Sequence, residues 1–232
     1  MCGRFSLSGE IDFYADYFGA TDIATESLSP SWNVAPTDPV YVVAQRGNED
    51  RTQTRALRSM RWGLVPHWSP DPTGQSININ ARVETVATTA AFRDSFRRKR
   101  CLIPADGFYE WESDGATRRP HWIARADGYP VGFAGIWATR REGENWTRSC
   151  AIITAAAGGV ISTLHDRMPV ALAPEVWEGW LDRGLTDPEL ALSLLQPIAS
   201  DLWMEREVSS KVNSVRNNGP DLLEPPDQLR LL

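Results

Sequence analysis

The chain has 232 residues, of which 42% are hydrophobic, enough to build the core of one large domain or two small ones. No stretch approaches the roughly 18 apolar residues of a membrane-spanning helix, and the N-terminus lacks the pattern of a signal peptide, so we expect a cytoplasmic protein with no membrane partner. The net charge of −6 argues against a polyanionic partner, but residues 1–100 carry +1 and residues 101–232 carry −7, so positive charge is concentrated in the first half.

The first half of the chain alternates helical and strand patterns. Ile11, Tyr14 and Phe18 recur at helical spacing, which predicts a short amphipathic helix over residues 9–19. Further along, we expect strands at residues 39–44 and around residues 60–64, followed by a helix that carries Phe92 and Phe96 on one face and ends near Arg100.

The second half is richer in strand patterns. Short apolar runs separated by turn residues predict a β meander with strands at residues 100–104, 107–111, 121–124, 131–137 and 149–155. Two helices should follow. One begins at Pro174, and the other begins with Thr186 as its N-cap and Glu189 completing a capping box. A final strand is expected at residues 203–208.

Strands dominate this pattern, and the helices are inserted without a regular βαβ alternation. We therefore expect an α+β fold: a single domain over residues 1–232, with its core at residues 2–225 and a short C-terminal tail. The sheet should be curved, largely antiparallel and barrel-like, with peripheral helices. We expect a monomer.

The densest basic segment covers residues 93–100, with five positive charges against one negative. One interpretation is a solvated helix end whose cations favour the negative end of the helix dipole. The alternative is a phosphate-binding edge.

Cys2 is the most informative of the three cysteines, because a small second residue normally allows removal of the initiator Met and leaves an N-terminal 1,2-aminothiol. The amine of such a group forms a Schiff base with an aldehyde, and the thiol then closes a stable thiazolidine ring. An α-amino group has a pKa of about 7.8 against about 10.4 for Lys, so far more of it is nucleophilic near neutral pH. Taken alone, Cys2 could equally be a small buried N-terminal residue.

Eight segments in a fixed order give Cys2 a context. They are MCGRF (1–5), NVAP (33–36), RWGLVP (61–66), INARVET (79–85), PADGFYEW (104–111), TAAA (154–157), HDRMP (165–169) and VNS (212–214). In this order they closely resemble the SRAP (SOS response-associated peptidase) family, over residues 2 to about 225. The resemblance implies a single SRAP-like domain that shields abasic sites in single-stranded DNA through a covalent DNA–protein cross-link, and a protein associated with the nucleoid when bound to DNA.

By this resemblance, Cys2 is the cross-linking nucleophile, Asn80 positions the ring-opened sugar through its amide, and Arg82 holds a neighbouring phosphate. An amide can hydrogen-bond a sugar hydroxyl, and a guanidinium can bind phosphate with two hydrogen bonds. Without the resemblance, the same two residues read as an Asn in a turn and a surface Arg.

The resemblance also makes Glu110 an acid–base residue, and its aromatic neighbours could raise the pKa of its carboxyl group into a useful range. It places His165 beside the Schiff base, where an imidazole can take or give a proton near neutral pH. The alternatives are an outward-facing strand Glu and a core His satisfied by Asp166.

Further family positions imply contacts with DNA. Trp68, together with Pro36, could stack on bases that lack a partner strand. Family members often have a second bulky residue after this Trp, whereas this chain has Ser69 there and His67 before it. We therefore expect a smaller wedge at the junction between single-stranded and double-stranded DNA. The remaining expected DNA contacts are Arg4, Asn33, Thr154 and Arg167.

Two other functions use the same residues. An N-terminal-nucleophile amidase or cysteine peptidase would use the Cys2 thiolate with His165 or Glu110 as base, and a noncatalytic single-strand-binding module would need only Trp68 and the arginines. By the resemblance we expect an enzyme of the SRAP type, a hydrolase or lyase able to remove its own Met1. The chain has no glycine-rich phosphate loop and no tight His/Cys cluster, so we expect no cofactor and no metal.

Overall fold

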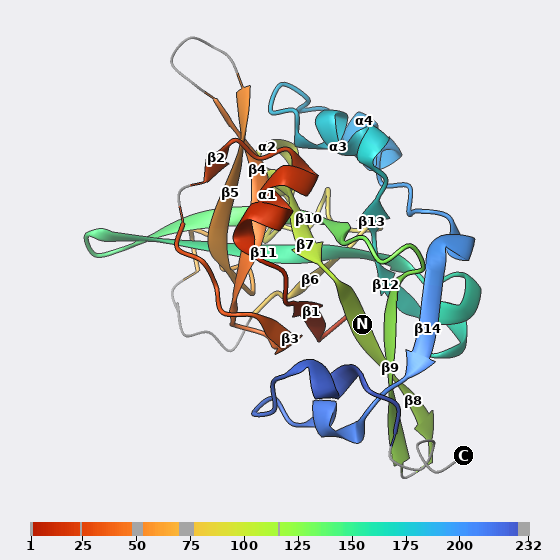
Figure 1. Cartoon of the computed structure of the whole chain (residues 1–232). Coiled ribbons are helices and arrows are strands. Elements are labelled where there is room, and N and C mark those ends of the chain that lie inside the picture. The colour runs from red at the N-terminus through yellow and green to blue at the C-terminus, as the bar shows by residue number, and fades with distance from the viewer. Residues whose placement is uncertain (1, 24, 48–52, 70–76, 116, 227–232) are drawn as a thin grey trace.

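A computed structural model describes residues 2–23, 25–47, 53–69, 77–115 and 117–226. Two sheets dominate it (Figure 1). The first has the order β14-β9-β8-β1-β3, with β1 (Phe5–Leu7), β3 (Ser31–Val34), β8 (Gly107–Asp114), β9 (Thr117–Arg125) and β14 (Trp203–Glu207). The second has the order β12-β11-β10-β7-β4-β5-β2, and β13 and β6 pair with β10 and β11 at its side. Its strands are β2 (Asp22–Ile23), β4 (Pro39–Gly47), β5 (Gln53–Trp62), β6 (Asn80–Arg82), β7 (Arg100–Ala105), β10 (Val131–Glu142), β11 (Asn145–Ala156), β12 (Arg167–Pro169) and β13 (Ala171–Leu172).

Five strands of the second sheet close into a barrel. The antiparallel order β11-β10-β7-β4-β5 returns to its start because β5 also pairs in parallel with β11, where Arg61 lies opposite Ser149 and Trp62 opposite Cys150. Most of the pairings are antiparallel, so the prediction of a curved, largely antiparallel, barrel-like sheet is confirmed.

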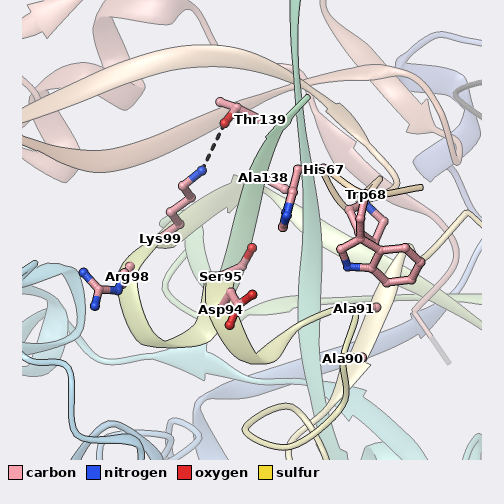
Figure 2. A pocket seen from close by; sticks show the side chains of 11 residues that line it. His67, Trp68, Ala90, Ala91, Asp94, Ser95, Arg98, Lys99, Ala138 and Thr139 are labelled. Atoms are coloured by element: carbon pink, nitrogen blue, oxygen red, sulfur yellow. Dashed lines mark hydrogen bonds between the residues drawn. The ribbon is translucent and has the colours of Figure 1, made fainter. Parts of the chain in front are cut away.

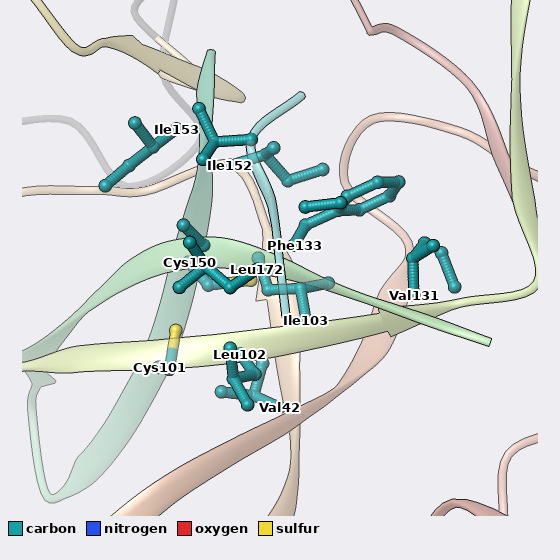
Figure 3. Packing of buried hydrophobic residues seen from close by; sticks show 14 of the residues in the cluster. Val42, Cys101, Leu102, Ile103, Val131, Phe133, Cys150, Ile152, Ile153 and Leu172 are labelled. Carbon is teal, nitrogen blue, oxygen red and sulfur yellow. The ribbon is translucent and has the colours of Figure 1, made fainter. Parts of the chain in front are cut away.

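The barrel interior is filled by large apolar side chains. Successive residues of a strand point to opposite faces, and the inward set includes Trp62, Ile103, Phe133 and Cys150, all fully buried. Figure 3 shows several of these side chains packed between the strands. The ring of Phe5 on β1 lies 4.9 Å from that of Trp62, so the same core joins the two sheets. Each such buried side chain contributes roughly 1.5–3 kcal/mol to folding.

The expectation of a simple meander is wrong, because β7 and β8 belong to different sheets. The chain crosses between them at Asp106, whose carboxylate accepts hydrogen bonds from the Ser8 amide (2.7 Å) and hydroxyl (2.8 Å) and from the Tyr14 hydroxyl (2.5 Å). This anchored corner sends β8 to pair with β1 and β9, while β7 pairs with β10 and β4.

Four helices cover the sheets within the described residues: α1 (Ile11–Phe18), α2 (Arg93–Arg98), α3 (Pro174–Leu181) and α4 (Pro188–Ser193). All four lie where the sequence predicts a helix. The predicted N-cap of α4 is wrong, because Asp187 and not Thr186 caps it, accepting hydrogen bonds from the amides of Glu189 and Leu190. A carboxylate directly before Pro188 reaches those amides, which leaves no role for a cap one residue earlier. None of the described helices is long and apolar enough to cross a membrane.

Arg100, at the end of the basic segment, is a buried structural residue. Its guanidinium donates to the carbonyls of Phe96 (2.9 Å) and Arg97 (3.1 Å) at the C-terminal end of α2 and of Trp180 (2.8 Å) in α3. It also donates to the carbonyls of Asp182 and Leu185. Helix C-termini leave carbonyls without partners, so this one side chain ties both helix ends to the barrel. For Arg100, the expectation of a solvated helix end is wrong, because the side chain is buried, although it does bind the carbonyls at a helix C-terminus.

Candidate active site

The C-terminal end of β11 gathers residues that are far apart in the sequence. It lies between β6 and β12, with Asn80 opposite Ile152, Arg82 opposite Thr154, and Arg167 opposite Ala156. Two short strands and the end of the long strand β11 thus hold four of the expected site residues at one end of the barrel.

Cys2 reaches this region through the pairing of β1 with β8. Phe5 lies opposite Phe108, and the amide of Tyr109 donates to the carbonyl of Arg4 (3.0 Å). Continued by one more pair, this antiparallel register brings the residues just before Arg4 beside Glu110. On the other side, the Asn80 amide Nδ2 donates to the carbonyl oxygen of Cys2 (2.8 Å). Cys2, Asn80 and Glu110 are therefore brought together.

The Cys2 thiol lies in an environment that disfavours a thiolate. The residue is fully buried, and burial raises the pKa of the thiol well above its ordinary value, with the negative charge of Glu110 raising it further. Activated catalytic cysteines lie instead beside a cation or a helix N-terminus that lowers the pKa. This thiol is in its neutral form near pH 7.

Glu110 can exchange protons near neutral pH. Its side chain is 3% exposed, and burial raises its pKa from 4.5 to about 7, with the charge of Asp166 also raising it. The expected effect of desolvation on this carboxyl group is therefore present.

His165 lies in the segment before β12, next to Asp166, whose charge acts on Glu110. Its Nδ1 accepts a hydrogen bond from the Arg167 amide (2.9 Å) and lies 2.6 Å from the Asp166 carboxylate. The two contacts require opposite protonation of Nδ1, since the amide needs a lone pair and the carboxylate needs a proton. Burial lowers the pKa of His165, which favours the neutral ring, with Nδ1 as acceptor and the proton on Nε2.

The two polar atoms of the Asn80 side chain differ in their hydrogen bonding. Its Oδ1 is buried and has no hydrogen-bond partner among the described residues, although Nδ2 is fixed on Cys2. Buried acceptors are normally paired, so this oxygen is available to a donor, such as a hydroxyl group, that enters beside Cys2.

The expected DNA contacts differ in their exposure. Trp68 is 56% exposed and Arg82 is exposed. Arg167 makes a bidentate ion pair with Glu84 (2.6 and 2.9 Å) and donates to the carbonyl of Thr154 (2.7 Å). Pro36 is partly exposed, and the following Thr37 has a φ of 82°, a conformation that is rare for a β-branched residue.

Other expected contacts are largely internal. Asn33 is buried, and its Nδ2 donates to the carbonyls of Ser214 (3.0 Å) and Asn217 (2.8 Å), while its Oδ1 accepts from Arg4 (2.6 Å). The Thr154 side chain is fully buried. In this structure Asn33 braces the C-terminal segment and orients Arg4, and Thr154 orients Arg167.

Trp68 lines a pocket of 210 Å³ between the segment after β5 and helix α2. Figure 2 shows Trp68 at one side of this pocket and Arg98 and Lys99 at the other. The Lys99 ammonium donates to the Thr139 hydroxyl (3.0 Å). The basic segment thus contributes the exposed Arg98 and the partly exposed Lys99 to the pocket that the exposed Trp68 ring lines.

Sequence reasoning overlooked Glu84 as the partner of Arg167, although it lies within the INARVET segment. The available signal was its position two residues after Arg82, although it lies in the turn that follows β6 and not on the strand. In the part of the chain that the structure describes, no group of three or more His, Cys, Asp or Glu side chains is arranged to hold a metal ion.

Comparison with known proteins gives consistent results. The family model described as "SOS response associated peptidase (SRAP)" matches residues 1–215. The chain is 39% identical to the abasic site processing protein YoqW of Bacillus subtilis, covering 97% of this chain and 99% of that protein, and 34% identical to YedK of Escherichia coli, covering 97% and 100%. A crystal structure of a protein from Bacteroides thetaiotaomicron matches with a TM-score of 0.82 at 22% identity, covering 97% of this chain and 99% of that one. A phage-related protein from Bordetella bronchiseptica matches with a TM-score of 0.71 at 28% identity, covering 90% and 95%.

Proposed function

Because the chain belongs to the SRAP family of abasic site processing proteins, we propose that it traps the aldehyde of an abasic site in single-stranded DNA as a thiazolidine on Cys2. Removal of Met1 gives Cys2 a free α-amine next to its thiol. The ring-opened abasic sugar supplies the aldehyde. In the product, the nitrogen and the sulfur of Cys2 are both bonded to the former aldehyde carbon.

The amine attacks first. An α-amine has a pKa of about 7.8, so a substantial fraction is unprotonated near neutral pH. Its attack on the aldehyde gives a carbinolamine, which loses one water to give an imine. The thiol then adds to the imine carbon, its proton passes to the nitrogen, and the five-membered ring closes. The net change is one C–N bond and one C–S bond formed and one water released.

Glu110 moves the protons of these steps. With a pKa of about 7, it can donate a proton to the departing hydroxyl group of the carbinolamine and then accept one from the thiol as the ring closes. His165, neutral and with its proton on Nε2, is a second proton donor for the sugar oxygen. Asn80 Oδ1 accepts a hydrogen bond from a hydroxyl of the opened sugar.

The observation that carries this proposal is the environment of the Cys2 thiol. A cysteine peptidase needs a thiolate at the start of its reaction, whereas burial and the nearby Glu110 charge raise the pKa of this thiol. A thiazolidine route uses the thiol only after the imine has formed, with Glu110 as the base that removes its proton. The geometry therefore favours the aldehyde trap over the peptidase.

The DNA partner is inferred from the exposed groups around the site. Trp68 offers a stacking surface for an unpaired base, and Arg82 offers a phosphate contact. A continuous duplex would keep its bases stacked on one another, so we propose single-stranded DNA as the substrate. Noncovalent capture should weaken as salt is added.

The decisive experiment separates the amine from the thiol. A residue that cannot be removed, placed before Cys2, keeps the thiol and converts the amine into an amide, so it should abolish the heat-stable adduct with an abasic oligonucleotide. Cys2→Ser keeps the amine and should give an imine. Borohydride reduction should trap this imine, whereas heating without reduction should destroy it. Normal cross-linking by the extended protein would refute attack by the Cys2 amine.

A second measurement tests Glu110. Glu110→Gln keeps the shape of the side chain but cannot titrate, so single-turnover adduct formation should slow by roughly 10²-fold while DNA binding remains. The matched control is Glu26→Gln, the same chemical change at an exposed position. An unchanged rate in Glu110→Gln would remove this residue from the mechanism.

A further inference from the structure

The end of the barrel where Arg148 of β11 lies opens into a cavity of 480 Å³. We call it the barrel mouth. It lies between β4, β5, β10 and β11, and its volume falls in the range of about 300–1,000 Å³ typical of small-molecule sites. Its lining residues are Ala44, Gln45, Arg46, Ala56, Arg58, Met60, Trp137, Arg148 and Arg183.

Positive charge dominates the barrel mouth although the whole chain carries −6. Four of its lining residues are arginines and none is acidic. Arg46 and Arg58 share the carboxylate of Asp22 (3.1 and 2.7 Å). Arg148 and Arg183 are exposed and make no hydrogen bond or ion pair with any described residue.

One further cation, Lys99, extends this field on the side of Arg183. The Arg183 guanidinium reaches the end of β4, where a Cβ on Gly47 would lie 3.0 Å from its Nη1. Lys99 lies beside the mouth, with its ammonium 5.1 Å from the centre of the Trp137 ring, and the charge of Arg183 helps burial to lower the pKa of Lys99. Cations held this close together are stabilised by an anion between them.

The floor of the barrel mouth is apolar. Ala44, Ala56 and Met60 are buried, and the partly exposed indole of Trp137 lines the cavity beside them. An aromatic wall next to guanidinium groups suits a ligand that combines a flat ring with a phosphate, because rings stack on indole and phosphate oxygens accept paired N–H bonds from Arg.

The barrel mouth is separate from the candidate active site. Arg148 and Thr154 lie on the same strand six residues apart, which corresponds to about 20 Å. Between them the interior is filled by fully buried side chains, including Trp62, Cys150 and Ile152. No reactant at Cys2 therefore reaches the mouth through the barrel.

We propose that the barrel mouth binds a nucleoside phosphate, with its base against Trp137 and Met60 and its phosphate between Arg148 and Arg183. The ligand chemistry is the same for a free nucleotide and for the 5′-phosphorylated end of a DNA strand. This site does not depend on the cross-linking chemistry of Cys2.

The test is calorimetric titration of the full chain with three probes: deoxyadenosine monophosphate, a 5′-phosphorylated single-stranded oligonucleotide without an abasic site, and inorganic phosphate. The variant R148A/R183A should bind the first two at least tenfold more weakly than the wild type. The control R141A/R216A removes the same two charges from exposed positions outside the mouth and should keep the wild-type affinity.

Each outcome decides a part of the proposal. Binding of the free nucleotide supports a small-molecule site. Oligonucleotide binding that R148A/R183A weakens and R141A/R216A does not supports a strand-end site, because the DNA contacts proposed beside Cys2 are intact in both double variants. Equal affinity in the two double variants, no saturable binding, or inorganic phosphate binding as tightly as the nucleotide would overturn it. The titration uses no abasic site, so its failure leaves the Cys2 proposal intact, and a failure of cross-linking leaves this proposal intact.

Discussion

Glu110→Gln should make the protein more stable at alkaline pH while slowing its reaction. Burial raises the pKa of Glu110 from 4.5 to about 7, so the folded state binds this proton more tightly than the unfolded state does. The stability that this group contributes is complete below about pH 4.5 and is lost as the pH rises through about 7. A difference of 2.5 pH units at about 1.36 kcal/mol each gives a loss of about 3 kcal/mol.

Glutamine stays neutral at every pH and avoids this loss. The variant should therefore gain stability over the wild type progressively between pH 5 and 8, reaching about 3 kcal/mol at pH 8. Urea unfolding of both proteins at pH 5, 6, 7 and 8 measures the difference. Glu26→Gln serves again as the matched control, because this side chain is exposed.

A stability difference that does not change between pH 5 and 8 would show that Glu110 is ionised throughout that range, and the reasoning from burial would fail. The reactivity assay gives the complementary result. A variant that is both more stable and about 10²-fold slower would show that the protein keeps a costly buried carboxyl group for its chemistry.

Three further changes test other contacts. Arg100→Met leaves five backbone carbonyls without their donor and should lower the free energy of unfolding by about 3–5 kcal/mol. Arg98→Met at an exposed position should change it by about 0.5 kcal/mol or less, and similar urea midpoints for the two variants would contradict the structural role of Arg100. Asn33→Ala should cost about 2–3 kcal/mol and speed proteolysis after residue 208, and weaker DNA binding at unchanged stability would instead indicate a direct contact. Glu84→Gln frees Arg167 from its ion pair and should tighten noncovalent binding of single-stranded DNA roughly fivefold, about 1 kcal/mol; weaker binding in a fluorescence anisotropy titration would show that Glu84 positions Arg167 rather than competing with DNA.

Hydrophobic periodicity predicted the helices and strands well where one face of the element is buried and the other is exposed to solvent. The helix expected at residues 9–19 is α1 (Ile11–Phe18), with Tyr14 and Phe18 buried as the spacing indicates. The strand expected at residues 131–137 continues to Glu142 in β10, because the outer part of the β10–β11 hairpin is solvent-exposed and carries no apolar alternation. Its length is set by pairing with β11, which hydrophobic periodicity cannot report.

The barrel closure and the short strands could not be read in this way. The parallel pairing of Arg61 with Ser149 joins residues 88 positions apart, and β6 has only three residues, too few for a periodic signal. For the site, chemical reasoning from the residues left alternatives open at Asn80, Glu110 and His165. The family resemblance selected among them, and only the three-dimensional arrangement revealed Asn33 as an internal brace and the cluster of arginines at the barrel mouth.

The buried state of the cysteines has a consequence for oxidation. Peroxides and alkylating agents attack the thiolate form of cysteine, and burial raises the pKa of Cys2, Cys101 and Cys150 alike. An exposed, low-pKa nucleophile would be consumed by the oxidants that also damage DNA bases. In the proposed mechanism, a thiol that stays protonated until an imine forms beside it would remain reduced under oxidising conditions, so its low reactivity would make it selective for the aldehyde.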